Sequence, residues 1–254
     1  MDIAITRQVS RSIVKCELTF LQREPIDVAR ARQQHAQYEA ALKDLGLAVL
    51  SLPEEPDLPD SVFVEDTALV LDECAIITRP GAASRRLETT SIAQVLAAFR
   101  ELRHIQAPAR VDGGDILQLG RCIYVGLTQR SDTNAMEQMQ EMLAPLGYKV
   151  RAIRVSGCLH LKSAATEVAR DVLLLNPAWV DQGVFEGVKI IEIDPSEPHA
   201  ANALRLGDSA MYSAAFPRTR ERLAGSGIHT VIVDADELAK AEGALTCCSL
   251  VFGI

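Results

Sequence analysis

The chain has 254 residues, of which 48% are hydrophobic and 24% are charged, and its formal net charge is −8. This composition is typical of a globular protein, and an acidic chain without a Lys/Arg cluster is unsuited to nucleic acid and better placed to attract a cationic small molecule. No apolar run reaches the length of a membrane span and no signal peptide is visible. The six cysteines show no CxxC spacing, which favours reduced thiols and a cytoplasmic location over a disulfide scaffold or a zinc ribbon.

One structural unit recurs along the chain, in which a helix is followed by a strand, a loop and a hairpin. In the first unit, helical spacing of apolar residues over 27–44 precedes a strand over 47–52 and a hairpin with arms at 67–71 and 75–78. Later units are expected to contain helices over 89–101, 133–146, 178–184 and 218–225, strands over 103–106, 148–155, 188–193 and 229–233, and hairpins over 115–127, 160–175 and 202–214. A last helix over 235–241 and a final strand over 245–252 end the chain, which leaves a strand over 2–7 to close the set.

The repetition predicts the fold class. A repeat that cannot bury its own apolar face stacks on its neighbours, and closing the repeats into a ring removes exposed sheet edges. We therefore predict an α/β fold in which five helix–strand–hairpin units form a five-bladed α/β propeller, closed by the two chain ends. Residues 1–254 would form a single domain. The alternative is a mixed α/β sheet whose regularity is coincidental.

Unusual polar residues occupy the same place in each unit, in the loop before the hairpin. With Asp66, Asp112, His160, Asn202 and Cys247 as markers, they recur about every 45 residues. Equivalent positions of a ring meet at one end of its axis, so these side chains should converge although they are far apart in the sequence. The loops therefore predict a functional site.

The converging residue types indicate nucleophilic chemistry. A thiolate is the reactive form of cysteine and is stabilised by a nearby cation, so Cys247 is the candidate nucleophile. On a strand over 245–252, successive side chains face opposite ways, so Cys248 should face away from the cleft and pack as a small hydrophobe. His160 could relay protons because its ordinary pKa lies near neutrality, and Asp112 could hold its imidazole.

Carboxylates and arginines suggest the ligand. Asp60, Glu65 and Asp66 are costly to bring together unless a cation lies between them, and a planar guanidinium suits paired carboxylates. The arginine-containing loop 79–86 and Arg130 could bind a carboxylate at the other end of the ligand. This combination points to an arginine-like amino acid held at both ends.

A set of short motifs follows one another along the chain, over 59–66, 77–82, 84–86, 112–115, 160–163, 200–202 and 245–249. Together they closely resemble the dimethylarginine dimethylaminohydrolases, in the same order, from about residue 18 to the C-terminus. This family belongs to the pentein superfamily of guanidino-group-modifying enzymes, whose fold is a five-bladed α/β propeller. The resemblance therefore implies the same fold as the repeat pattern.

The resemblance implies hydrolysis of Nω-methylated L-arginine to L-citrulline and methylamine or dimethylamine, without a cofactor. Cys247 would attack the guanidinium carbon, and His160 would act as general acid and base around a covalent S-alkylthiouronium intermediate. No metal is implied, and zinc would act only as an inhibitory ligand of Cys247. Asp60 and Asp66 would hold the guanidinium, and Arg85 and Arg130 the α-carboxylate. The full set implied to bind substrate is Leu18, Asp60, Glu65, Asp66, Arg85, Arg130 and Ala241.

Two other functions stay open. An arginine deiminase-like hydrolase of unmethylated arginine or another guanidino compound would look much the same, because methyl groups leave little trace in sequence. A non-catalytic metal- or redox-responsive thiol protein could use Cys247, Cys248 and His160, but it has no need of an acidic guanidinium pocket. The partner expected of an enzyme is a small-molecule substrate, with neither nucleic acid nor membrane, and a homodimer is compatible with the resemblance.

Overall fold

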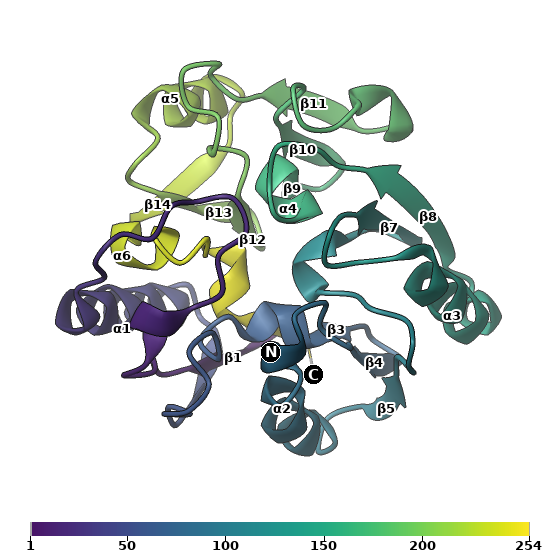
Figure 1. Cartoon of the computed structure of the whole chain (residues 1–254). Coiled ribbons are helices and arrows are strands. Elements are labelled where there is room, and N and C mark those ends of the chain that lie inside the picture. The colour runs from purple at the N-terminus through teal and green to yellow at the C-terminus, as the bar shows by residue number, and fades with distance from the viewer. Residues whose placement is uncertain (1, 254) are drawn as a thin grey trace.

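Five small sheets surround a common centre in the computed structural model, which describes residues 2–253 (Figure 1). Each sheet has three strands, and its middle strand pairs antiparallel with one neighbour and parallel with the other. The same pattern is repeated around the ring. The predicted five-bladed α/β propeller is confirmed.

The sheets follow the chain in order, and only the first combines the two chain ends. Their strand orders are β15-β1-β2, β3-β4-β5, β6-β7-β8, β11-β10-β9 and β12-β13-β14. The strands are β1 (Asp2–Arg7), β2 (Ala48–Leu52), β3 (Ala68–Val70), β4 (Cys74–Ile77), β5 (Glu101–His104), β6 (Ile116–Leu119), β7 (Cys122–Leu127), β8 (Lys149–Arg154), β9 (Ala165–Ala169), β10 (Val172–Leu175), β11 (Lys189–Glu192), β12 (Ala203–Leu206), β13 (Ser209–Ser213), β14 (His229–Val233) and β15 (Leu250–Gly253). The helices are α1 (Val28–Asp44), α2 (Glu88–Leu96), α3 (Thr133–Leu143), α4 (Leu161–Ala164), α5 (Pro217–Gly225) and α6 (Asp236–Ala239).

The helices range from the single turns α4 and α6 to the 17-residue α1. The larger ones, α1, α2, α3 and α5, lie around the outside of the ring (Figure 1). Within residues 2–253, no helix has both the length and the apolar character needed to cross a membrane.

The two chain ends close the ring. Strand β1 lies between β15, with which it pairs antiparallel, and β2, with which it pairs parallel. Ile3 is opposite Phe252 and Ile5 is opposite Leu250, and all four side chains are buried in one apolar cluster. The strand expected over 2–7 therefore completes the first unit as predicted.

Helix α1 supports the segment that carries the two adjacent cysteines. The Asp27 side chain caps the helix by accepting from the N–H groups of Ala29 and Arg30. Its inner face buries Tyr38, whose hydroxyl donates to the Leu245 carbonyl over 3.0 Å and lies 2.7 Å from the Ser249 hydroxyl. The helix is thus fixed to both sides of residues 246–248.

The structure corrects the predicted strand over 245–252. Residues Thr246–Cys248 form a turn of 3-10 helix, η7, and β15 begins at Leu250. The Thr246 hydroxyl donates to Glu65, and its backbone N–H donates to Asn202, so side-chain contacts with other units impose the turn. The expectation that strand alternation separates Cys247 from Cys248 was therefore wrong.

Two predicted helices are shorter than expected, and a third ends early. The segment 178–184 contains only the 3-10 turn η6 (Gln182–Val184), where Asp181 accepts from the Gly183 N–H. The segment 235–241 contains the single turn α6. The helix expected over 89–101 ends at Leu96, because residues from Glu101 onward pair with β4 as strand β5.

Candidate active site

The loops that precede the hairpins meet at the centre, joined by a closed ring of hydrogen bonds. Asp66 in η2 (Val64–Thr67) accepts from the Gly114 N–H in η4 (Gly113–Asp115) over 2.9 Å. The other links are Leu161 N–H to Asp115 (2.9 Å), the Asn202 side chain to the Lys162 carbonyl (3.0 Å), the Thr246 N–H to Asn202 (3.2 Å) and the Thr246 hydroxyl to Glu65 (2.7 Å). The convergence expected from the repeat is therefore observed.

A cavity lies beside this ring. Its free volume is about 10 Å³, room for roughly one water molecule. Its walls come from loops of different units and from the segment before α1: Glu17, Asp60, Phe63, Asp66, Arg85, Arg130, Leu159, His160, Ala241, Glu242, Gly243 and Cys247. Because an amino acid is much larger than a water molecule, part of this wall has to move before one can enter.

His160 is a buried cation in the cavity wall. Its Nε2 lies 3.0 Å from Asp112 Oδ2, and its Nδ1 lies 3.9 Å from Asp66 Oδ1. Burial disfavours the charged ring, but the carboxylates of Asp66, Asp112 and Asp115 outweigh burial and raise the pKa of His160 to about 9. His160 is therefore an imidazolium at neutral pH and has a proton to donate.

Two glycines allow the ring of loops to close around this histidine. A Cβ on Gly113 would lie 1.9 Å from the Glu65 carbonyl oxygen, and one on Gly114 would lie 2.6 Å from His160 Nδ1. Real Cβ atoms do not approach heavy atoms so closely. The Gly113–Gly114 pair thus serves close packing against the site as well as a tight turn.

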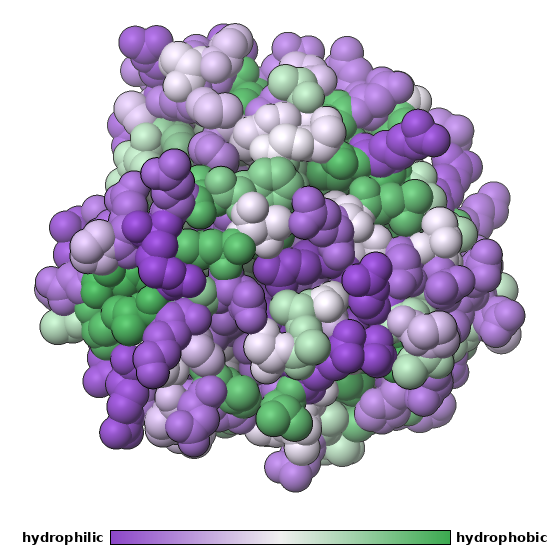
Figure 2. Space-filling view, viewed as in Figure 1, coloured by the Kyte–Doolittle hydropathy of each residue, from purple (hydrophilic) through white to green (hydrophobic). Residues whose placement is uncertain are grey.

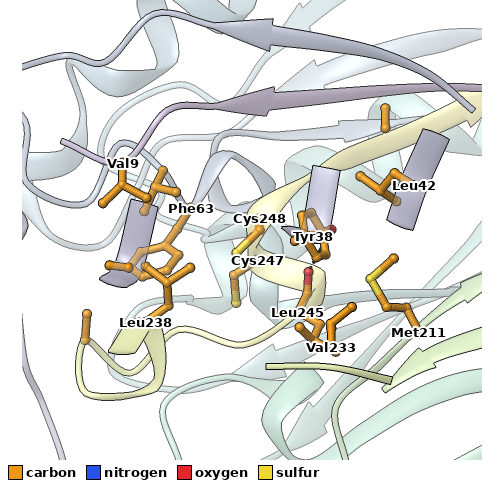
Figure 3. Packing of buried hydrophobic residues seen from close by; sticks show 14 of the residues in the cluster. Val9, Tyr38, Leu42, Phe63, Met211, Val233, Leu238, Leu245, Cys247 and Cys248 are labelled. Atoms are coloured by element: carbon orange, nitrogen blue, oxygen red, sulfur yellow. Dashed lines mark hydrogen bonds between the residues drawn. The ribbon is translucent and has the colours of Figure 1, made fainter. Parts of the chain in front are cut away.

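Cys247 faces the cavity from η7, and its neighbour does not. Both lie in the hydrophobic cluster that also contains Phe63, Tyr38 and Leu245 (Figure 3). Only Cys247 lines the cavity, whereas the Cys248 thiol donates to the Ala244 carbonyl over 3.4 Å. The two sulfurs therefore have different surroundings. The cause is the turn of 3-10 helix and not the alternation of side chains along a strand.

The Cys247 thiol is not ionised by the protein alone. Burial raises its pKa well above the usual range, and the carboxylates of Glu65 and Asp66 add to this effect. A cation bound beside the sulfur would act in the opposite direction, because it would favour the thiolate.

A buried arginine holds the acidic part of the site together. Arg85 Nη1 donates to Asp66 over 2.6 Å, Nη2 donates to Glu88 over 2.8 Å, and Nη2 also approaches the carbonyl of Phe63. Burial opposes ionisation of Asp66, but His160 and Arg85 outweigh it and lower the pKa of Asp66 to about 2. Most donors of Arg85 are therefore committed to protein acceptors, which leaves little of its guanidinium for a ligand.

Arg85→Ala is expected to destabilise the protein by roughly 3–5 kcal/mol, because Glu88 would remain buried without a cation and Asp66 would keep only His160. Urea unfolding followed by circular dichroism measures this loss. Arg151→Ala is the matched control, since Arg151 is 41% exposed and pairs with an exposed Glu186, and its effect should stay below about 1 kcal/mol. Equal unfolding midpoints for the two variants would contradict the structural role of Arg85.

Two groups in the cavity wall keep hydrogen-bonding capacity for a ligand. Within residues 2–253, Asp60 forms no ion pair; its Oδ2 accepts from the Glu17 N–H over 3.1 Å, and burial raises its pKa. In the same part of the chain, Arg130 Nη1 is buried without a hydrogen-bond partner, and its nearest carboxylate oxygen, on Asp112, is 3.7 Å away. A free carboxylate and a free guanidinium donor in one cavity match a ligand with both charges.

Most residues expected from the sequence line the cavity: Asp60, Asp66, Arg85, Arg130, His160, Ala241 and Cys247. Asp112 lies behind His160, Leu18 lies next to Glu17 without lining the cavity, and Glu65 is bound to Lys162 (2.7 Å) and Thr246. Sequence reasoning missed Glu17, Phe63, Leu159, Glu242 and Gly243 in the wall and Glu88 and Asp115 behind it. Phe63 and Asp115 lie within the motifs over 59–66 and 112–115 but were not singled out there, whereas the others carry no motif, so only the fold brings them to the site.

One group of ligand atoms is close enough to hold a cation. Single ligand atoms of Asp66, Asp112 and His160 lie within 4.8 Å of one another. Two of these groups, His160 and Asp112, are joined by the 3.0 Å contact between Nε2 and Oδ2. The carboxylates of Asp66 and Asp112 both favour the protonated ring of His160.

A family model and individual relatives, compared with this chain by sequence, agree with each other. A family model described as "N,N dimethylarginine dimethylhydrolase, eukaryotic" matches residues 18–248. The N(G),N(G)-dimethylarginine dimethylaminohydrolase of Pseudomonas aeruginosa is 36% identical over 250 residues, which cover 98% of each chain. The enzyme of the same name from Streptomyces coelicolor is 35% identical over 249 residues, which cover 97% of this chain and 95% of that one.

Solved structures agree with the sequence comparison. A mutant of the Pseudomonas aeruginosa enzyme, complexed with citrulline, has a TM-score of 0.91 at 35% identity and covers 98% of both chains. The N-terminal domain of ArgZ, an arginine dihydrolase from cyanobacteria, has a TM-score of 0.89 at 20% identity and covers 98% of this chain and 97% of that one. At that identity the second likeness shows the fold alone.

Proposed function

Because the chain belongs to the dimethylarginine dimethylaminohydrolase family, we propose that it hydrolyses Nω-methylated L-arginine to L-citrulline and methylamine or dimethylamine. The observation that carries this proposal is the cavity in which the Cys247 thiol and the His160 imidazolium face buried carboxylates. The citrulline bound to the Pseudomonas enzyme agrees with the proposed product. A thiol sensor would not need the acidic wall.

The two ends of the substrate would be held by opposite charges. Asp66, ionised and close to the catalytic pair, would bind the guanidinium, with Asp60 as the second carboxylate and Glu65 contributing from behind the wall. Arg130 would bind the α-carboxylate through its unpartnered Nη1. Arg85 would add the little donor capacity that Asp66 and Glu88 leave free. Ala241 would contribute from within the wall and Leu18 from beside it.

The reaction would proceed in two halves. The bound guanidinium favours ionisation of Cys247, whose proton passes to solvent as the substrate binds, and the thiolate attacks the guanidinium carbon. The His160 imidazolium, held by Asp112, gives its proton to the departing methylamine or dimethylamine, which leaves a covalent S-alkylthiouronium group on Cys247. Neutral His160 then takes a proton from water, and the resulting hydroxide attacks the same carbon. As the C–S bond breaks, the proton of the added hydroxyl passes to the leaving Cys247 sulfur, which releases citrulline and restores the thiol.

The remaining proposals concern the setting of the reaction. We propose one catalytic domain, because residues from every unit of the ring contribute to the site or to the hydrogen bonds around it. We also propose that no cofactor or metal takes part and that zinc acts only as an inhibitor on Cys247. All six cysteines are free thiols, which suits a cytoplasmic location. A homodimer stays a prediction.

The substrate is tested by comparing asymmetric dimethylarginine, monomethylarginine and arginine after dialysis of the protein against a chelator. We expect citrulline and a stoichiometric amount of dimethylamine or methylamine from the methylated substrates. Citrulline and ammonia from arginine alone would move the protein to a deiminase. No turnover of any of the three, or turnover that requires added metal, would contradict the proposal.

A further inference from the structure

A short segment before α1 covers the cavity, and we call residues 16–26 the lid. In Figure 1 the dark purple chain crosses the face of the ring near α6 and β12. Its ends are buried at Cys16 and Ile26, whereas Phe20 and Leu21 in its middle are 49% and 40% exposed. Figure 2 shows the same face as a largely closed surface. The lid is therefore anchored at both ends and exposed between them.

One carboxylate binds the middle of the lid. Glu242 accepts hydrogen bonds from three successive backbone N–H groups, those of Thr19 (2.9 Å), Phe20 (2.5 Å) and Leu21 (2.6 Å). Successive N–H groups that point to one place form a concave anion site. Glu242 reaches it from a left-handed backbone conformation with φ of 59°, which a residue other than glycine seldom adopts. The Glu242 carboxylate thus holds the backbone of residues 19–21 through three hydrogen bonds.

The lid also contacts Asp60 and Arg130, the two wall groups that keep hydrogen-bonding capacity for a ligand. The Glu17 N–H donates to Asp60 over 3.1 Å, and the Thr19 hydroxyl accepts from Arg130 Nη2 over 3.0 Å. Since the free volume of the cavity is about 10 Å³, a ligand can enter only when the wall opens. In the closed arrangement that the structure shows, the lid is bonded to both Asp60 and Arg130.

We propose that Glu242 is a positioning residue that latches the lid over bound substrate. Glu242 lies in the cavity wall, but its carboxylate is bound to the lid N–H groups, and it acts through Thr19 and Glu17 on Arg130 and Asp60. The kinetic consequence of this inference rests on the proposed function. The latch itself consists of hydrogen bonds between Glu242 and the lid backbone, which do not depend on the reaction. A charged acceptor binds N–H groups more strongly than a neutral one, which explains a glutamate here.

Amide hydrogen exchange of peptides covering 16–26 tests the latch directly. In Glu242→Ala the amides of Thr19, Phe20 and Leu21 should exchange roughly 100-fold faster, and Glu242→Gln should fall between it and the wild type. Glu24→Gln is the matched control, since Glu24 lies exposed in the same lid and makes no side-chain hydrogen bond or ion pair within residues 2–253. Exchange in β7 reports whether each variant is folded. Unchanged exchange in the lid of a folded Glu242→Ala protein would overturn the proposal.

Steady-state kinetics with asymmetric dimethylarginine test the positioning. Glu242→Ala should raise KM roughly 10-fold with kcat changed only a few-fold, because the reacting groups are untouched while substrate binding loses its closed wall. Glu24→Gln should match the wild type. Faster lid exchange with an unchanged KM would overturn the positioning role. If the wild type itself does not turn over, the proposed function fails, and the exchange experiment still decides the latch.

Discussion

Cys247→Ser is expected to abolish citrulline formation from dimethylarginine, with kcat reduced roughly 10³-fold or more. Cys247 lines the cavity opposite buried carboxylates, and its thiol becomes reactive only when a cation favours the thiolate. A serine hydroxyl of similar size has a far higher pKa and would not ionise under the same influence. Citrulline release under saturating substrate measures the effect.

Cys248→Ser is the matched control. Cys248 is 2% exposed and its thiol donates to the Ala244 carbonyl, a bond that a serine hydroxyl can also make. We expect this variant to retain activity within a few-fold of the wild type. A loss as large as that of Cys247→Ser would contradict the assignment of the nucleophile, and so would turnover by Cys247→Ser at the wild-type rate.

The propeller could be predicted because its evidence is periodic. Each unit repeats the same order of helix, strand, loop and hairpin. Strand β1 completes the sheet that the repeat leaves incomplete, where it pairs with β15 and β2. The segment around Cys247 could not be predicted in the same way. Thr246 and the cysteines have side chains typical of strands, but hydrogen bonds from Thr246 to Asn202 and Glu65, both distant in sequence, select a 3-10 turn.

The site followed from the sequence where its residues carry recognisable chemistry. Asp66, His160 and Cys247 stood out by residue type and by equivalent positions in the repeat, and Asp60 stood out as a carboxylate near Asp66. The fold brings all four to one cavity. Glu88 did not, because an acidic residue in the first turn of a helix usually stabilises that helix at the surface. Only the tertiary structure reveals that it is buried against Arg85.

The same limit applies to the lid. Glu242 follows directly after Ala241, yet its binding to backbone N–H groups of residues 19–21 joins segments more than 200 positions apart. Backbone donors have no signature in the sequence, since every residue except proline has one. Contacts of this kind can be read from coordinates and not from motifs.

His160→Gln is expected to reduce kcat roughly 10²- to 10⁴-fold, because the variant can neither protonate the leaving amine nor activate water. Glutamine fits the buried space and can still donate to Asp112, so the wall should remain intact. Rates of citrulline and amine release measure both halves of the reaction. Unimpaired amine release would contradict the role of His160 as general acid.

The pH dependence identifies which protonation state of His160 is used. Its pKa is raised to about 9 in the folded protein, so the imidazolium is present below that value and is lost as the pH rises through it. We therefore expect kcat/KM to fall above about pH 9.

Asp112→Asn removes one carboxylate that raises the pKa of His160, so the pH at which kcat/KM falls should be lower by roughly one unit. Arg110→Ala, which changes a partly exposed pair with Asp132, should leave the profile in place. If Asp112→Asn left the alkaline limb unmoved, Asp112 would not hold the proton of His160, and the raised pKa would have to rest on Asp66 and Asp115 alone.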